Sequence, residues 1–144
     1  MKVSDILSAK GQKVRTISPE ETAINAANRL RIENIGALVV SRDGRGIYGM
    51  LSERDIINGL AEHGSELPHL PVSRLMSRSV VTCAPGDSIA EISRIMTRRR
   101  VRHLPVLQDG QLAGIVSIGD VVKHRLDEVE METNVLRDYA IARG

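Results

Sequence analysis

The stretch Gly49-Met50-Leu51-Ser52-Glu53-Arg54-Asp55 decides the fold, because it returns later in the chain as Gly114-Ile115-Val116-Ser117-Ile118-Gly119-Asp120. In each copy a glycine opens a short apolar run, a serine closes it, and an aspartate follows the serine by three positions. A short apolar run is typical of a buried strand, and a serine before an acidic first turn is typical of a helix start. Each copy therefore predicts a strand that passes directly into a helix.

The similarity extends over both halves of the 144-residue chain. With one short gap, residues 16–60 align with residues 82–125, and the identities include Thr16 with Thr82, Pro19 with Pro85, Val40 with Val106, and Asp43-Gly44 with Asp109-Gly110. Collinear identities over half a chain indicate an internal duplication. We expect a first repeat over residues 1–65, a linker over 66–71, a second repeat over 72–126, and a C-terminal helical extension over 127–144.

Each repeat is predicted to fold as β-α-β-β-α. The expected strands are residues 14–17, 37–40 and 47–51 in the first repeat and 80–83, 104–107 and 112–116 in the second. The first helix of each repeat should begin with a capping residue, Ser18 in a capping box with Glu21, or Asp87. Its apolar positions are Ala23, Ala27 and Leu30 in one copy and Ile89, Ile92 and Met96 in the other.

One repeat of this size is too small to cover its own sheet. We therefore expect the two repeats to pack sheet to sheet. The predicted fold class is a mixed α/β (α+β) architecture of two pseudo-symmetric repeats with an added C-terminal helix.

The composition excludes several classes of protein. Hydrophobic residues make up 42% of the chain and charged residues 26%, which is typical of a globular protein. No apolar run is long enough for a transmembrane helix or a signal peptide, so we expect a cytoplasmic protein. Cys83 is the only cysteine and is expected to be a small buried hydrophobe, while His63, His69 and His124 lack zinc spacing and are expected on the surface. We expect the protein to have no enzymatic activity and no catalytic cofactor.

The two seven-residue stretches resemble the G-x-x-[ST]-x-x-D signature of CBS domains. The segment Arg102-His103-Leu104-Pro105-Val106 resembles the second strand of the same family. The resemblance covers about residues 3–125, in two copies. It implies a CBS pair, or Bateman module, which is a regulatory fold that binds adenosine nucleotides in clefts between its halves. The expected ligand is AMP, ADP, ATP or NAD(H).

The aspartates of the two stretches are the candidate ribose ligands. One carboxylate can accept hydrogen bonds from both hydroxyls of a ribose, and Asp55 and Asp120 follow a strand at the start of a helix, where ligands often bind in α/β sheets. Ser52 and Ser117 add a hydroxyl for ribose or phosphate. The alternative interpretation is that the serines only cap the helices and the aspartates only face the helix dipoles.

The resemblance implies two clefts that each draw on both repeats. One cleft would join Ser117 and Asp120 with Thr16 and the backbone near Ala37 and Leu38. The other would join Ser52 and Asp55 with Thr82 and the backbone near Leu104. The candidate phosphate ligands are Arg102, His103 and Arg54. Because Gly119 stands where the other copy has Arg54, we expect the clefts to differ in ligand or affinity.

The expected partners are a second copy of the chain and a separate downstream protein. The resemblance implies a homodimer in which helices of the two modules meet, and we expect the C-terminal helix to pack on its own domain or on the second copy. One alternative is a nucleic-acid-binding regulator that uses the arginines between Arg94 and Arg102, although the net charge of +2 and the two aromatic residues argue against it. Another is a protein-interaction scaffold with empty clefts.

Overall fold

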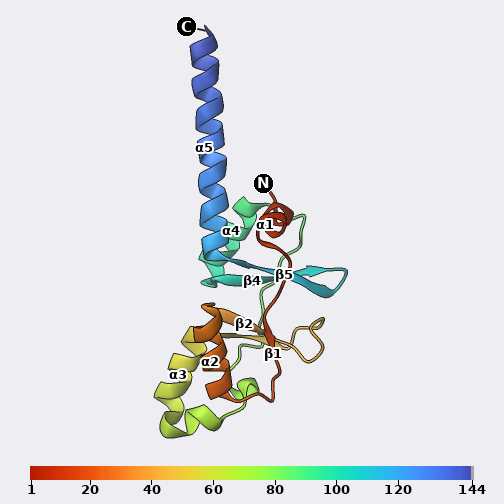
Figure 1. Cartoon of the computed structure of the whole chain (residues 1–144), viewed down its shortest axis with the longest axis vertical. Coiled ribbons are helices and arrows are strands. Elements are labelled where there is room, and N and C mark those ends of the chain that lie inside the picture. The colour runs from red at the N-terminus through yellow and green to blue at the C-terminus, as the bar shows by residue number, and fades with distance from the viewer. Residues whose placement is uncertain (144) are drawn as a thin grey trace.

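The computed structural model describes residues 1–143 as two stacked halves from which one long helix projects (Figure 1). The first half contains β1 (Thr16–Ile17), α2 (Ala23–Glu33), β2 (Ala37–Val40), β3 (Gly49–Ser52) and α3 (Glu53–His63). The second contains α4 (Ile89–Arg99), β4 (His103–Gln108), β5 (Gln111–Ser117) and α5 (Ile118–Arg143). A helix α1 (Val3–Lys10) precedes the first half, and the 3-10 helices Gly64–His69 and Val72–Arg74 connect the two.

The two sheets face each other between outer helices, as predicted (Figure 1). In the first half β1 runs parallel to β2, and β2 pairs antiparallel with β3 so that Ala37 lies opposite Ser52. In the second half β4 and β5 pair so that His103 lies opposite Ser117. The serine of each repeated stretch therefore occupies the same place in both sheets.

The strand predicted over residues 80–83 is wrong, because only Cys83 pairs there. Cys83 donates its amide to the Pro105 carbonyl at 3.0 Å and accepts from the Leu107 amide at 2.8 Å. In the first repeat the equivalent pairing extends further, since the Val39 amide donates to the Arg15 carbonyl. Pro105 occupies the position of Val39 and has no amide hydrogen, so this bond is lost in the second repeat.

Both predicted capping residues are wrong, by four positions in the first half and by one position in the second. Thr22, not Ser18, caps α2, and Ser88, not Asp87, caps α4. Thr22 is extended, and the residues on either side of it pair with the segment that connects the halves. The Glu21 carbonyl accepts from the Val72 amide and the Ala23 amide donates to the Leu70 carbonyl, each at 2.8 Å.

The second half repeats this arrangement. The Asp87 carbonyl accepts from the Val3 amide at 2.9 Å, and the Ile89 amide donates to the Met1 carbonyl at 3.1 Å. In each half, pairing with a segment from outside that half thus moves the start of the helix to a later residue. Along those helices Ile89, Ile92 and Met96 are buried as expected, whereas Ala26 takes the buried place expected for Ala27.

The two segments that cross to the opposite half, α1 and residues 72–77, also complete the core of that half. We call them the crossing segments. Val3, Ile6 and Leu7 of α1 pack with the buried residues of the second half, which are Cys83, Ile89, Ile92, Met96, Leu104, Val106, Val116 and Val121. Val72, with Leu75 and Met76, packs on the first-half core of Ile17, Ala26, Leu30, Leu38, Val40 and Leu51. Each core therefore depends on a segment that lies before the other repeat in sequence.

The glycine of each repeated stretch allows a crossing segment to approach closely, because it has no side chain. A Cβ on Gly49 would lie 2.6 Å from the Ser77 carbonyl oxygen, and a Cβ on Gly114 would lie 2.6 Å from Leu7 Cδ2. The Met50 amide donates to the Ser77 carbonyl at 3.0 Å, which fixes that close approach. Glycine at these positions is therefore a packing requirement of the repeat.

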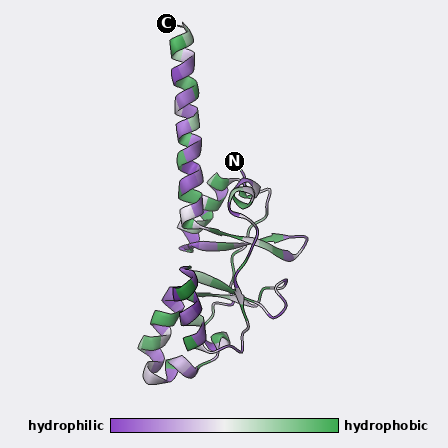
Figure 2. Ribbon diagram, in the orientation of Figure 1, coloured by the Kyte–Doolittle hydropathy of each residue, from purple (hydrophilic) through white to green (hydrophobic). Residues whose placement is uncertain are grey.

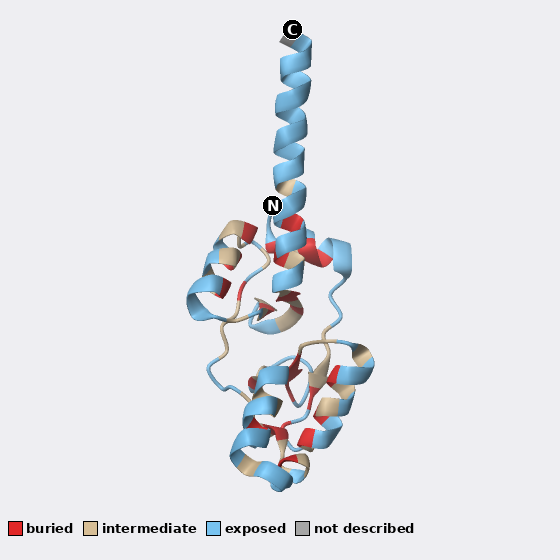
Figure 3. Cartoon of the chain, turned by 90° about the vertical axis from the view of Figure 1, so that its left-hand side faces the viewer, coloured by how far each residue is buried: buried red, intermediate tan, exposed pale blue. Residues whose placement is uncertain are grey.

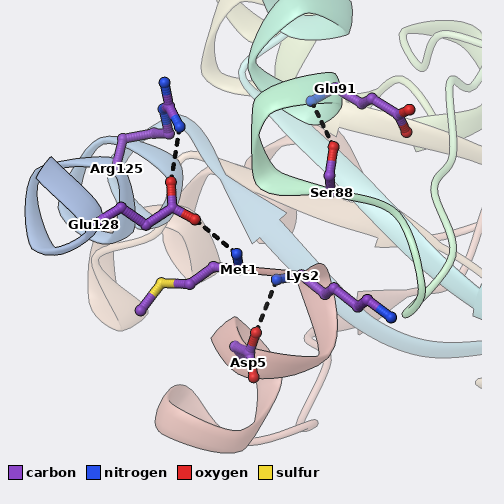
Figure 4. Close-up of polar contacts among 7 residues, drawn as sticks. All are labelled: Met1, Lys2, Asp5, Ser88, Glu91, Arg125 and Glu128. Atoms are coloured by element: carbon purple, nitrogen blue, oxygen red, sulfur yellow. Dashed lines mark hydrogen bonds and ion pairs between the residues drawn. The ribbon is translucent and has the colours of Figure 1, made fainter. Parts of the chain in front are cut away.

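Helix α5 continues without a break through the predicted C-terminal extension. Its first turns pack on the second half, where Val121 is buried, and the later turns project away from the body with exposed side chains (Figures 1 and 3). The Glu128 carboxylate joins its base to the N-terminus through a 2.7 Å contact with the Met1 ammonium group and a 2.7 Å bond from Arg125 (Figure 4). His124, in the early turns of α5, is buried, which corrects its expected surface position.

Candidate ligand-binding clefts

Two adjoining cavities lie between the halves. The first cleft has a volume of about 350 Å³ and is lined by Lys10, Lys13, Arg15, Asn34, Ile35, Gly36, Ala37, His103, Ile115 and Ser117. The second cleft has a volume of about 820 Å³ and draws on β3, α3, the segment before α4, and the start of α5. Gly36, Ala37, His103 and Ser117 line both clefts. Both volumes lie within the range of small-molecule sites.

The first cleft lies beside an ion pair between Asp120 and Lys10. The Lys10 ammonium group donates to Asp120 Oδ2 at 2.7 Å, and the Ser117 amide donates to the same oxygen at 2.9 Å. Partial burial acts to raise the pKa of Asp120, but the Lys10 ammonium group and the Ser117 hydrogen bonds outweigh it, so the pKa lies below its usual value. Asp120 is therefore held as a carboxylate. It does not itself line either cavity, but it contacts Lys10 and Ser117, which line the first.

Three basic side chains line this cleft that the sequence analysis did not select. Lys10 belongs to the end of α1, and Lys13 and Arg15 belong to the segment that leads into β1. Lys10 also donates to the Ile115 carbonyl at 3.1 Å, which ties α1 to β5. The K-x-x-K-x-R spacing was visible in the sequence, but the contact with Asp120 crosses the whole chain and has no local signal.

The remaining residues expected in the first cleft occupy mixed positions. Ala37 and Ser117 line the cavity, together with the backbone neighbours Ile35 and Gly36. Leu38 is fully buried in the first core, and half-buried Thr16 does not line the cavity, whereas the adjacent Arg15 does. The structure therefore brings together one strand end, one helix start and a basic segment.

The second cleft contains the corresponding residues of the other copy. Ser52, Arg54 and Asp55 line it, and so do Arg102 and His103. Thr82 and Leu104 do not line the cavity. Leu104 is fully buried. Val80 and Val81, which precede Thr82 in the chain, line the cavity in place of Thr82. Arg100 also lines this cleft, so part of the arginine run borders a cavity.

The carboxylates of the two clefts differ in their partners. Asp55 Oδ2 accepts from the Ser52 amide at 2.8 Å and from the Ser52 hydroxyl at 3.1 Å. Within residues 1–143 no basic side chain forms an ion pair with Asp55, whereas Lys10 pairs with Asp120. Ser52 caps α3, and the Ser117 hydroxyl accepts from the Asp120 amide at 3.1 Å. Capping is therefore confirmed for both serines, and a ligand would share these groups with the helix start.

His103 lines both clefts. A Cβ on Gly36 would lie 3.1 Å from His103 Cε1, so the ring packs directly on the strand backbone of the first half. Burial, and then the positive charge of Lys10, lower the pKa of His103, while Glu53 and Asp120 act in the opposite direction. The neutral imidazole is thereby favoured between the cavities.

The single thiol of the chain is held in its protonated form. Burial raises the pKa of the Cys83 thiol to about 12, which removes the thiolate needed for nucleophilic attack. Among residues 1–143 no cluster of three His, Cys, Asp or Glu side chains could hold a metal ion. No helix in that range is long and apolar enough to cross a membrane.

Two related repeats, β-α-β-β-α in the first half and α-β-β-α in the second, pack sheet to sheet around two inter-repeat clefts. This arrangement defines a paired-repeat module rather than a single-sheet domain. The chain belongs to the CBS domain family, whose family model matches residues 3–62 and 72–127. Both matched segments contain one copy of the glycine-serine-aspartate stretch.

The chain is similar to other small CBS proteins along most of its length. It is 32% identical over 124 residues to the CBS domain-containing protein YhcV of Bacillus subtilis, covering 86% of this chain and 87% of that protein. The crystal structure of the CBS-domain containing protein ATU1752 from Agrobacterium tumefaciens superposes with a TM-score of 0.84 at 39% identity, covering 87% of this chain and 99% of that one.

A more distant structure shares the fold. It is the CBS domain pair of protein MJ0100 in complex with 5′-methylthioadenosine and S-adenosyl-L-methionine. It superposes with a TM-score of 0.78 at 22% identity, covering 89% of this chain and 98% of that one.

Proposed function

We propose that this CBS pair is a regulatory module that binds an adenosine nucleotide in the first cleft. The observation that carries the proposal is the cavity of about 350 Å³ lined by Lys10, Lys13 and Arg15, of which Lys10 also forms an ion pair with the Asp120 carboxylate. A nucleotide presents neighbouring ribose hydroxyls and phosphates, which need an acceptor and cations respectively. The cleft offers both at one place.

Each part of the nucleotide has a candidate partner. Asp120 would accept from the ribose hydroxyls through Oδ1, because Lys10 and the Ser117 amide already bond to Oδ2. Lys13 and Arg15 would bind the phosphates as charge-assisted donors. The apolar side chains of Ile35 and Ile115 line the same cavity and would enclose the base, whose edge could pair with the backbone near Ala37.

The second cleft would bind a nucleotide less tightly or bind a different one. Ser52 and Asp55 would contact the ribose and Arg54, Arg102 or His103 the phosphates, with the backbone near Thr82 and Leu104 available to the base. Asp55 lacks the neighbouring ammonium group that Asp120 has, and this cleft is more than twice as large. We propose two unequal sites for these reasons.

The ligand would be a signal and not a substrate. AMP, ADP, ATP and NAD(H) share the adenosine that these residues would read, so the chain would report energy or redox state to a separate protein. The MJ0100 pair, bound to two adenosine-containing molecules, supports adenosine as the shared recognition element. The high pKa of Cys83 supports a binding role over covalent catalysis.

A thermal-shift panel with AMP, ADP, ATP, NAD, NADH and S-adenosylmethionine tests this proposal, after small molecules released by denaturation have been identified by mass spectrometry. A ligand that binds only the folded chain raises the melting temperature by mass action. Asp120→Asn should abolish most of the shift from the tighter ligand, and Asp55→Asn is the matched control at the equivalent position. No shift across the panel would favour an interaction scaffold with vacant clefts, and equal loss in both variants would refute the assignment to the first cleft.

A further inference from the structure

The projecting part of α5 carries an exposed apolar stripe that its own fold does not cover. The family match ends at residue 127, whereas α5 continues to Arg143. The stripe is defined by steps of four and three residues and consists of Val122, Leu126, Val129, Thr133, Leu136 and Ala140. Val122, Leu126, Val129 and Leu136 are 51%, 58%, 51% and 69% exposed. Alternating steps of four and three are the spacing of the buried seam of a coiled coil. Figure 2 shows hydrophobic and hydrophilic residues alternating along the whole helix.

We call this stripe the seam. Its one hydroxyl, on Thr133, has a hydrogen-bond partner within the helix. Thr133 Oγ1 donates to the Val129 carbonyl at 2.9 Å. A partner helix could therefore cover Thr133 without leaving an unpaired donor. The seam is in effect apolar over its full length.

The charges beside the seam match a parallel copy of the same helix. In a parallel pair, the residue directly before Leu126 or Thr133 in one helix lies opposite the residue five positions further along in the other helix. Arg125 then faces Glu130 of the second copy, and Glu132 faces Arg137 of the second copy. An antiparallel pair centred on the projecting turns would instead bring Glu130 against Glu130 and Glu132 against Glu132. Flanking charges of this kind select partner and orientation.

The body also exposes apolar side chains on α3. Ile57 on α3 occupies the repeat position of Val122 on α5 and is 65% exposed, and Leu60 beside it is 56% exposed. Helix α5 runs along the direction in which the two halves are stacked, and α3 lies below its base on the same side (Figure 1). A parallel pair of α5 helices would therefore place α3 near α3 of the second copy.

We propose that two copies of the chain associate through a parallel two-stranded coiled coil of their α5 helices, with the seam from Val122 to Ala140 and with equivalent repeats facing each other. Most of the seam, from Val129 onward, lies beyond the matched CBS repeats, and the arrangement does not depend on what the clefts bind.

Sedimentation equilibrium of the full chain tests the association. The unchanged chain should be a dimer at micromolar concentration. The double variant Val129→Glu/Leu136→Glu places charges in the seam and should weaken the dimer by about tenfold or more. Met131→Glu is the matched control, because Met131 is 61% exposed but lies outside the seam. A monomeric unchanged chain, or an unchanged dissociation constant in the seam variant, would overturn the proposal.

Disulfide cross-linking tests the orientation. Leu136→Cys should cross-link to the second copy under mild oxidation, since equivalent seam residues lie side by side only in a parallel pair. Met131→Cys should remain uncross-linked, and the native Cys83 is buried. Equal cross-linking of the two variants, or none in Leu136→Cys, would overturn the parallel pair. Exchange of the charges in Glu132→Arg/Arg137→Glu should retain the dimer, whereas Glu132→Arg alone should weaken it.

Discussion

Lys10 and Asp120 lie 110 positions apart in the chain, yet their side chains meet at 2.7 Å. The contact joins the end of α1 to the first turn of α5, and it sets the charge of the carboxylate beside the first cleft. It therefore links the packing of the crossing segment to the site at which we propose that a nucleotide binds.

Replacing Lys10 should destabilise the chain in a pH-dependent way. The pKa of Asp120 is lowered in the folded state, so the pair stabilises at pH above the unfolded carboxyl value of about 4 and loses its effect as pH falls through the lower folded value. Lys10→Met should reduce the free energy of unfolding by about 1 kcal/mol at pH 7, because the pair is partly exposed. Urea unfolding at pH 7 and in acid measures this.

The control for that experiment is Lys13→Met, which removes a neighbouring ammonium group that forms no ion pair within residues 1–143. It should leave stability nearly unchanged at both pH values. A Lys10→Met effect that is the same in acid as at neutral pH would show that the loss comes from packing and not from the ion pair.

The repeated stretch was the most informative part of the sequence. It predicted the paired repeat, the strand that runs into a capped helix, and the proximity of Ser52 and Ser117 to the clefts. These features follow from local patterns, since a capping serine and an apolar run act over a few residues. Strands β2 and β4 were predicted for the same reason.

Features that depend on crossing segments were beyond local patterns. Ser18 and Glu21 have the spacing of a capping box, yet the Glu21 carbonyl accepts from the Val72 amide and α2 begins only at Ala23. Lys10, Lys13 and Arg15 reach a cleft only because α1 packs on the opposite repeat. A helix propensity of a few tenths of a kcal/mol does not compete with such tertiary pairing.

The two glycines of the repeated stretch should differ in their tolerance of alanine. At Gly49 the added Cβ meets a backbone carbonyl oxygen at 2.6 Å, whereas at Gly114 it meets the terminal methyl of Leu7 at the same distance. A side chain can move to another rotamer, but the Ser77 carbonyl is fixed by its bond to Met50. Gly49→Ala should therefore cost about 3 kcal/mol and Gly114→Ala about 1 kcal/mol. Chemical denaturation compares them, and a larger cost at Gly114 would contradict the packing argument.

Arg100 should be a site of stored backbone strain. It ends α4 with φ of 56°, in the left-handed region, as Asn34 ends α2 with φ of 53°. Asparagine and glycine accept this conformation more readily than arginine does. Arg100→Gly should raise the free energy of unfolding by about 1 kcal/mol, whereas Arg99→Gly, one residue earlier within the helix, should lower it by a similar amount. Opposite signs in the two melting curves confirm the strain, and a loss in both variants contradicts it.

His103 should make the chain less stable in mild acid. Its pKa is lowered in the folded state by burial and by Lys10, so the unfolded chain binds more protons near pH 6 and the free energy of unfolding falls as pH drops below the ordinary histidine value of about 6.5. Glu53 and Asp120 oppose this shift, and their charges limit its size.

The test compares His103→Gln with the unchanged chain by urea unfolding at pH 7.5 and pH 5.5. Glutamine does not titrate, so the difference in stability between the two chains should shift in favour of the variant as pH falls. His69→Gln, at an exposed position, should show no such shift. If the unchanged chain instead gains stability relative to His103→Gln in acid, the imidazolium is stabilised between the clefts by Glu53 and Asp120, and the assigned neutral state of His103 is wrong.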